Sequence, residues 1–181
     1  PVFFSEKENI LLAVTGCGMN AATAAVARIC TKRTPQPEDF LVNIGTCAWV
    51  STKNESDETY KNVSGEVYLC KKITEDVTGR TFYPDILYRH PFVEQEIVTG
   101  AMPYRTEYTT ELINKHETVI KNSAADGFLY DMEASSIYQA GAYFFGPHQM
   151  LFLKIVTDRG NVLGLSAEIL KQSVADTVPE I

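Results

Sequence analysis

Short apolar stretches alternate with helix-forming stretches along most of the chain, and this alternation limits the fold more than any other feature. We expect strands at residues 9–16, 39–46, 65–73, 95–102, 127–132 and 150–156. We expect helices at residues 21–30, 108–120, 133–145 and 164–174. Apolar strands separated by helices are typical of an α/β fold in which helices cover both faces of a sheet. The polar segment at residues 51–64 has no apolar period and is predicted to be a flexible loop.

The charge balance favours a small ligand over a nucleic acid. The chain has 181 residues, with 16 basic and 23 acidic side chains and a net charge of −7. This charge repels phosphate backbones, and no basic stripe offsets it. No apolar run approaches the roughly 20 residues that span a membrane, so we expect no membrane partner.

The cysteines and histidines indicate neither disulfides nor a metal site. The four cysteines form no C-x-x-C pair, which favours reduced thiols in a cytoplasmic protein. The three histidines are scattered without the spacing of metal ligands, so we expect no bound metal. No cofactor motif is complete either. The glycine turn at residues 16–18 is followed by Ala21, where a dinucleotide-binding motif requires its third glycine.

Glycine or acidic residues follow several of the predicted strands: Gly16, Gly45, Gly100, Glu133 and Asp158. In open α/β sheets, ligands bind beyond the carboxyl ends of the strands, so these residues predict one small-molecule site. Each also has a simpler interpretation. Glu133 suits a helix start, Asp158 suits a turn cap, and the glycine turn needs no ligand at all. Alternatively, the amides of that turn face an anion, a ribose or water.

Six segments resemble, in the right order, motifs of the nucleoside phosphorylase and nucleosidase superfamily. The segment "YDMEASSI" is similar to its "xEMEAAAI", and "FLKIVTDRG" is similar to its "xxRxISDxx". Four weaker matches are "VTGCGMNAATAA", "LVNIGTCA", "GEVYL" and "EIVTGAM". The resemblance implies a three-layer α/β/α sandwich with a mixed, largely parallel central sheet. It implies a single domain over residues 1–181 that is N-terminally incomplete, because the superfamily's first strand precedes the matched region.

The resemblance also implies that the chain cleaves the bond between a ribose and a purine base. Glu133 would accept hydrogen bonds from the ribose hydroxyls and stabilise positive charge on the sugar, with Met132 packed against the ribose. Asp158 would hydrogen-bond or protonate purine N7. Further expected contacts are Tyr104, Cys47 and Ala48 at the base and Gly16, Gly18 and Thr46 at an anion or ribose turn. The implied partner is a purine nucleoside, with phosphate as an optional second ligand, and the implied assembly is a homo-oligomer.

Departures from the motifs leave the reaction open. Asn43 stands where hexameric phosphorylases place a phosphate-binding arginine, which favours water as the nucleophile. Trp49 replaces a glycine, where it narrows the pocket, stacks on a base or fills the core. Hydrolysis of an adenosine-type nucleoside is the favoured activity. The alternatives are a phosphate-dependent phosphorylase and a nucleoside-binding protein without turnover.

Overall fold

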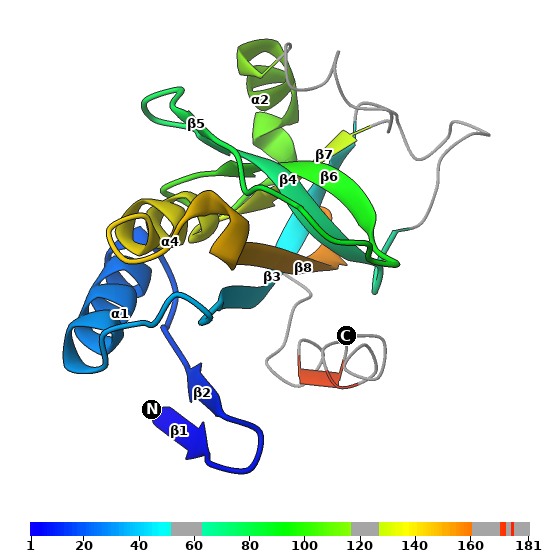
Figure 1. The fold of residues 1–181 in the computed structure, drawn as a ribbon. Coiled ribbons are helices and arrows are strands. Elements are labelled where there is room, and N and C mark those ends of the chain that lie inside the picture. The colour runs from blue at the N-terminus through cyan, green and yellow to red at the C-terminus, as the bar shows by residue number, and fades with distance from the viewer. Residues whose placement is uncertain (52–62, 117–126, 161–170, 173–174, 176–181) are drawn as a thin grey trace.

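The central sheet contains six strands and has a mixed topology (Figure 1). The computed structural model describes residues 1–51, 63–116, 127–160, 171–172 and 175. In spatial order the strands are β5 (Thr81–Phe82), β4 (Val67–Glu75), β6 (Val93–Thr99), β7 (Gly127–Asp131), β3 (Leu41–Ser51) and β8 (Met150–Asp158). The start of β4 also pairs with β8, so the sheet closes on itself. This architecture confirms the predicted α/β class with a central mixed sheet.

The strand directions bring two strand ends together beside the middle of β3. Strand β8 runs parallel to β3 and pairs with its residues 41–48. Strand β7 runs antiparallel to β3 and pairs with its residues 48–51. Ala48 is therefore the partner of both Tyr130 in β7 and Asp158 in β8. The segments that follow β7 and β8 consequently start on either side of one position in the sheet.

Helices cover the two faces of the sheet. The described helices are α1 (Met19–Lys32), α2 (Thr109–Lys115), α4 (Ala134–Gly141) and the short 3-10 helices η1 (Thr106–Tyr108) and η2 (Pro147–Gln149). Helices α1 and α4 pack on each other and share a core cluster with Cys47 and Trp49 of β3. Leu112 of α2 shares the other cluster with Ala48 and Val50. Because successive strand residues point to opposite faces, α2 lies across the sheet from α1 and α4.

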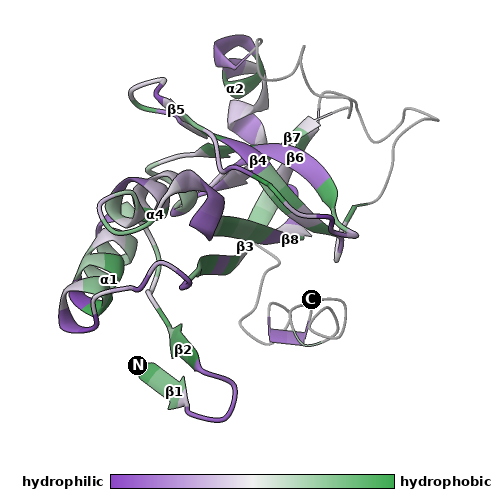
Figure 2. Ribbon diagram, viewed as in Figure 1, coloured by the Kyte–Doolittle hydropathy of each residue, from purple (hydrophilic) through white to green (hydrophobic). Residues whose placement is uncertain are grey.

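The burial predicted for the first strand is wrong. Strand β2 (Ile10–Ala13) forms within the expected residues 9–16, but it pairs only with β1 (Val2–Ser5), in a separate two-stranded sheet. Figure 2 shows that both strands are strongly apolar. Apart from Leu11, which is partly buried, their large apolar side chains are nevertheless at least 49% exposed, as is that of the following Val14. An apolar run identifies a strand, but its burial requires a covering element, and the described residues supply none here.

The other predicted elements differ from the structure mainly at their ends. Strand β3 is longer than residues 39–46, and its first half exposes Val42 and Ile44, which the sequence predicted to be buried. Helix α4 ends at Gly141 rather than at residue 145. Strands β1 and β5 were not predicted. The end of the predicted helix at 108–120, the core of the predicted loop at 51–64 and most of the predicted helix at 164–174 lie outside the described residues.

None of the helices in the described ranges has the length and apolar character that crossing a lipid bilayer requires.

Candidate functional site

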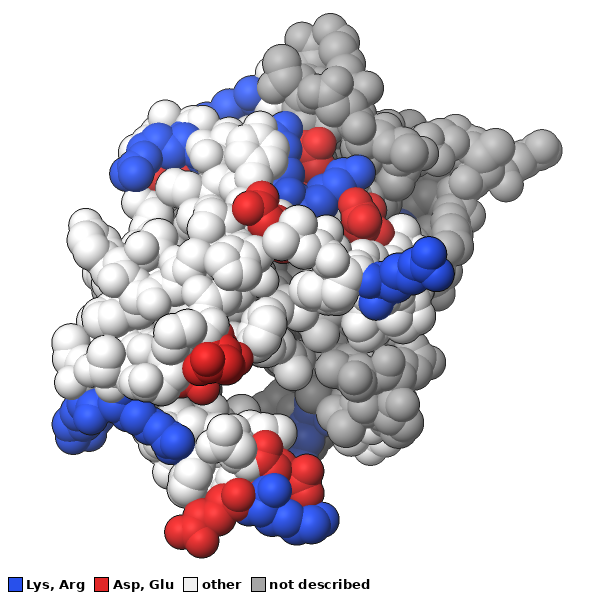
Figure 3. Space-filling model, in the orientation of Figure 1, with Lys and Arg blue, Asp and Glu red and all other residues white. Residues whose placement is uncertain are grey.

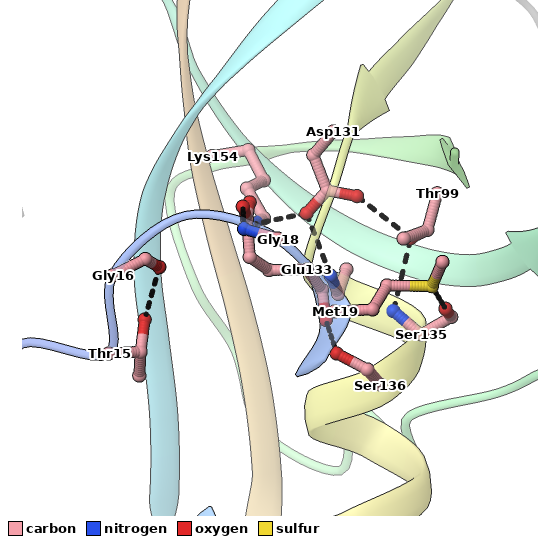
Figure 4. Close-up of polar contacts among 11 residues, drawn as sticks. Thr15, Gly16, Gly18, Met19, Thr99, Asp131, Glu133, Ser135, Ser136 and Lys154 are labelled. Carbon is pink, nitrogen blue, oxygen red and sulfur yellow. Dashed lines mark hydrogen bonds and ion pairs between the residues drawn. The ribbon is translucent and has the colours of Figure 1, made fainter. Parts of the chain in front are cut away.

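Glu133 lies where the N-termini of two helices meet (Figure 4). It is the N-cap residue of α4, and its Oε1 accepts a hydrogen bond from the backbone N–H of Gly18, the N-cap residue of α1, at 2.6 Å. The structure thus brings together two residues that the sequence singled out separately. Gly16 and Gly18 have φ angles of +85° and +91°, which side-chain-bearing residues rarely adopt. The amide and dipole of α1 favour a negative charge at this position.

A buried network fixes the backbone from which Glu133 projects. Asp131, at the end of β7, accepts hydrogen bonds from the Thr99 hydroxyl at 2.7 Å and from the Ala134 N–H at 2.8 Å. Its Oδ2 also lies 2.8 Å from the Lys154 ammonium group. The Thr99 hydroxyl oxygen accepts from the Ser135 N–H at 3.0 Å. The first two amides of α4 are therefore capped by Asp131 and Thr99, and the Glu133 side chain is not needed as a cap.

Lys154 is the most deeply buried cation among the described residues. Its side chain is 1% exposed and that of Asp131 is 0% exposed. Burial alone would lower the pKa of Lys154, but the charge and hydrogen bond of Asp131 outweigh burial and raise it. Gly45 makes room for the ammonium group, since a Cβ at Gly45 would lie 3.3 Å from Nζ. The ion pair is completely enclosed.

Cys17 lies in the same turn and interacts with Glu133. It is exposed, whereas Cys30, Cys47 and Cys70 are buried. Partial burial raises the pKa of the Cys17 thiol, and the charge of Glu133 and a hydrogen bond to Glu133 raise it further. The thiol form is therefore favoured at neutral pH, as a donor to the carboxylate.

Asp158 occupies the end of β8, just after an irregularity in the sheet. The register between β3 and β8 shifts by one residue between Cys47 and Ala48, which leaves Thr157 as the extra residue. Asp158 Oδ1 accepts from the Gly160 N–H at 2.7 Å, and Oδ2 accepts from the Thr157 hydroxyl at 3.3 Å. Burial raises the pKa of Asp158, and these two hydrogen bonds only partly oppose it. Asp158 therefore keeps its proton at a higher pH than an ordinary aspartate does.

The remaining predicted base contacts surround Asp158 in the fold but expose little surface. Tyr104 is 5% exposed and packs so closely on Gly160 that a Cβ there would lie 2.5 Å from the ring. Ala48 is adjacent to Asp158 in the sheet and is buried, as is Cys47 on the opposite face. Burial is the main cause that raises the pKa of Cys47 well above its usual value. The roles of these residues stay predictions.

The structure also shows where three other predicted residues lie, but it contains no ligand that would test their expected contacts. Met132 precedes Glu133 and is partly buried, and Thr46 pairs with Ile155 next to the β8 end. Trp49 is 5% exposed and stacks on Tyr68 at a ring separation of 5.8 Å. Of the alternatives for Trp49, the structure supports the core-filling one. In the described ranges, no hydrogen bond joins Glu133 to Asp158, and no three acidic, histidine or cysteine side chains are placed to hold a metal ion.

Sequence reasoning missed Asp131, Lys154, Thr99 and Cys17. A usable signal existed for Lys154, which interrupts an otherwise apolar strand, because a lysine in a buried strand requires a partner. Asp131 is the matching acidic residue, but the nearby Glu133 fits the same strand-end pattern. Cys17 lies inside the predicted glycine turn at residues 16–18, but no sequence signal marks its thiol or Thr99 as part of the site.

No protein-family model and no curated protein sequence matches the chain, whereas solved structures share its fold. The chain is similar to the 5′-methylthioadenosine/S-adenosylhomocysteine nucleosidase of Neisseria meningitidis, solved with methylthio-immucillin-A (TM-score 0.63, 17% identity, 94% of this chain and 81% of that chain). It is similar to the Colwellia psychrerythraea enzyme of that name, solved with adenine (0.64, 15%, 91% and 71%). A futalosine hydrolase mutant of Helicobacter pylori also matches (0.59, 11%, 95% and 81%). These likenesses confirm the fold implied by the sequence motifs.

The buried ion pair predicts an asymmetric response to mutation. Lys154→Met keeps the volume but leaves the Asp131 carboxylate buried without its cation, and we expect the free energy of unfolding to fall by about 3–5 kcal/mol. The double variant Lys154→Met/Asp131→Asn removes both charges and should recover part of that loss. Denaturant unfolding of the three proteins measures the effect. Equal losses in the single and double variants would contradict the cost expected from leaving the Asp131 carboxylate buried without its cation.

The contact between Cys17 and Glu133 predicts a change in thiol reactivity. Glu133→Gln removes the negative charge that helps to raise the Cys17 pKa, so Cys17 should react faster with iodoacetamide at mildly alkaline pH. The rate profile against pH, followed by mass spectrometry, should shift to lower pH. The variant Cys17→Ser retains only the three buried cysteines, so any iodoacetamide labelling that it shows comes from them. An unchanged profile in Glu133→Gln contradicts the contact.

Proposed function

We propose that the protein is a purine nucleosidase that hydrolyses the N-glycosidic bond of an adenosine-type nucleoside. The observation that carries the proposal is the Glu133 carboxylate, held by the Gly18 amide at the N-terminus of α1. Glu133 lies two residues beyond the end of β7, and Asp158 lies at the end of β8; near their ends both strands pair with Ala48 of β3. The shared fold of the nucleosidases named above supports the assignment.

In this proposal Glu133 acts on the sugar. Cleavage of the bond between C1′ and N9 leaves positive charge on the ribose. A fixed carboxylate in a site shielded from water stabilises that charge more in the transition state than in the ground state. The network of Asp131, Lys154 and Thr99 keeps the carboxylate from reorienting as the charge develops. Met132 would line the ribose next to it.

Asp158 acts on the purine. Its raised pKa favours the carboxylic acid, which can donate a proton to N7 while the other oxygen accepts from a 6-amino group. Protonation makes the base a better leaving group, and a positioned acid contributes typically ~10²–10⁴-fold in rate. A 6-oxo purine has no amino donor for the second oxygen, so we expect adenosine-type substrates to be preferred over inosine.

Water is the proposed nucleophile, because none of the arginines in the described ranges stands at the strand position where the phosphorylase motif carries its phosphate-binding arginine. A phosphate dianion in a dry pocket usually requires charge-assisted donors such as a bidentate arginine. The neutral Asn43 stands at the strand where the phosphorylase motif carries its arginine. Its Oδ1 is buried and has no hydrogen-bond partner among the described residues. Arg28 and Arg33 lie toward the C-terminal end of α1, away from the turn that contacts Glu133.

Base release from adenosine-type nucleosides, measured with and without inorganic phosphate, tests the proposal. We expect free base and free ribose without phosphate. Ribose 1-phosphate would support a phosphorylase, and saturable binding without base release would support a binding protein. Glu133→Gln should lose most of its kcat while keeping its melting temperature, because Gln retains the shape but not the charge. Glu107→Gln, an exposed surface control, should retain wild-type kcat.

The raised pKa of Asp158 predicts opposite effects of Asp158→Asn on activity and on stability. A raised folded-state pKa means that the folded protein holds this proton more tightly than the unfolded chain does. The stabilising contribution is therefore complete below the unfolded pKa and lost as pH rises through the folded one. Asparagine stays neutral, so the variant should melt at a higher temperature than wild type at pH 7, with a smaller difference at acidic pH. Its kcat should fall at every pH.

A melting-temperature difference that does not change with pH would contradict the titration of Asp158. Wild-type activity in Asp158→Asn would contradict its role as the acid. Inosine cleaved as fast as adenosine would contradict the second contact, in which the carboxyl group accepts from the 6-amino group.

A further inference from the structure

A cavity lies away from Glu133, on the side of the sheet that α2 covers. It has a volume of about 350 Å³ and lies between β4, the turn that leads to β5, and the end of α2. This volume is at the lower end of the range of small-ligand sites. Its walls are mainly polar, and Lys72, Thr74, Asp76, Lys115 and His116 contribute to them.

The polar groups of this cavity are fixed by contacts of their own. The His116 and Asp76 side chains, 5% and 19% exposed, lie with Nε2 and Oδ1 2.7 Å apart. The Lys115 ammonium group lies 2.8 Å from the same oxygen. Burial would raise the pKa of Asp76, but the hydrogen bonds and charges of Lys115 and His116 outweigh it and lower the pKa. Asp76 is therefore a carboxylate that orders two donors at the cavity wall.

The lining of the cavity contains more ammonium groups than carboxylates, and each ammonium group is paired with one carboxylate. Two ammonium groups and one carboxylate line it, while the Glu96 carboxylate that pairs with Lys72 at 2.9 Å does not. Figure 3 shows basic and acidic side chains interspersed over the β4–β6 region below α2. Each ammonium group has three N–H donors, and in the described residues Lys72 pairs with Glu96 and Lys115 with Asp76. Donors of both lysines thus remain for a ligand, and the buried Thr74 adds a hydroxyl group.

We propose that this cavity binds a small oxyanion, a phosphate or carboxylate group, between Lys72 and Lys115. Lysine binds such groups as a compact point charge, and two lysines on different elements hold one anion better than either alone. Asp76 keeps Lys115 in place, and Glu96 keeps Lys72 in place. The site is independent of the proposed nucleosidase reaction, because no residue named for it takes part in that reaction.

The imidazole protons of His116 provide a direct probe of the cavity. The chain has three histidines, so the His116 signal can be assigned by comparison with His116→Gln. In the full chain, we expect the NMR chemical shift of the His116 imidazole protons to change saturably when inorganic phosphate is added at constant pH and ionic strength. A parallel titration with acetate tells whether a carboxylate suffices, and sodium chloride is the control for charge screening alone.

Lys115→Met should weaken phosphate binding by about tenfold or more, because a hydrogen bond between charged groups is lost while His116 still pairs with Asp76. Lys32→Met, with the same change of charge on α1, should bind as wild type does. Glu133→Gln should leave the His116 response intact, which separates this site from the nucleosidase site. An unsaturable shift, a shift equal to that with chloride, or equal binding by Lys115→Met overturns the proposal.

Discussion

The buried ion pair between Asp131 and Lys154 is the interaction on which the candidate site depends. It joins the end of β7 to the middle of β8, and the hydrogen bond from Thr99 adds the end of β6. Enclosing two charges is costly unless their remaining hydrogen-bonding capacity is filled. Here the Asp131 carboxylate receives three partners, from three different elements. The fold can therefore place a strand end, a helix start and a cation within one rigid unit.

Asp131 and Glu133 are only two positions apart, but they have different roles in this arrangement. Asp131 and Thr99 satisfy the first amides of α4, a task that an N-cap side chain usually performs. Glu133 occupies the N-cap position but makes no cap hydrogen bond with its side chain. Its carboxylate instead turns to the N-terminus of α1 and binds Gly18. The structural carboxylate is buried and paired with a cation, whereas the proposed catalytic carboxylate is held by an amide and a thiol.

The sequence predicted the positions of Glu133, Gly18 and Asp158 because strand ends and glycine turns leave local signals. It did not predict that Gly18 touches Glu133, since that contact depends on how α1 and α4 pack. The burial expected of residues 9–16 failed for a similar reason, because an apolar pattern does not specify its covering partner. Lys154 is a position where the sequence does carry a signal. A lysine in an otherwise apolar strand requires a buried partner, and Lys154 forms the buried ion pair with Asp131.

The bulge at the end of β8 lies at the point of the closed sheet where the carboxyl ends of β7 and β8 meet. Strands β7 and β8 run in opposite directions, so their carboxyl ends would normally lie at opposite edges. They meet because β3 is long enough to pair with β8 along its first part and with β7 along its last, with Ala48 at the change. At that residue the extra Thr157 interrupts the ladder, and such bulges redirect side chains next to functional sites. The position of Asp158 is thus set by one inserted residue, and the position of Glu133 by the helix that follows β7.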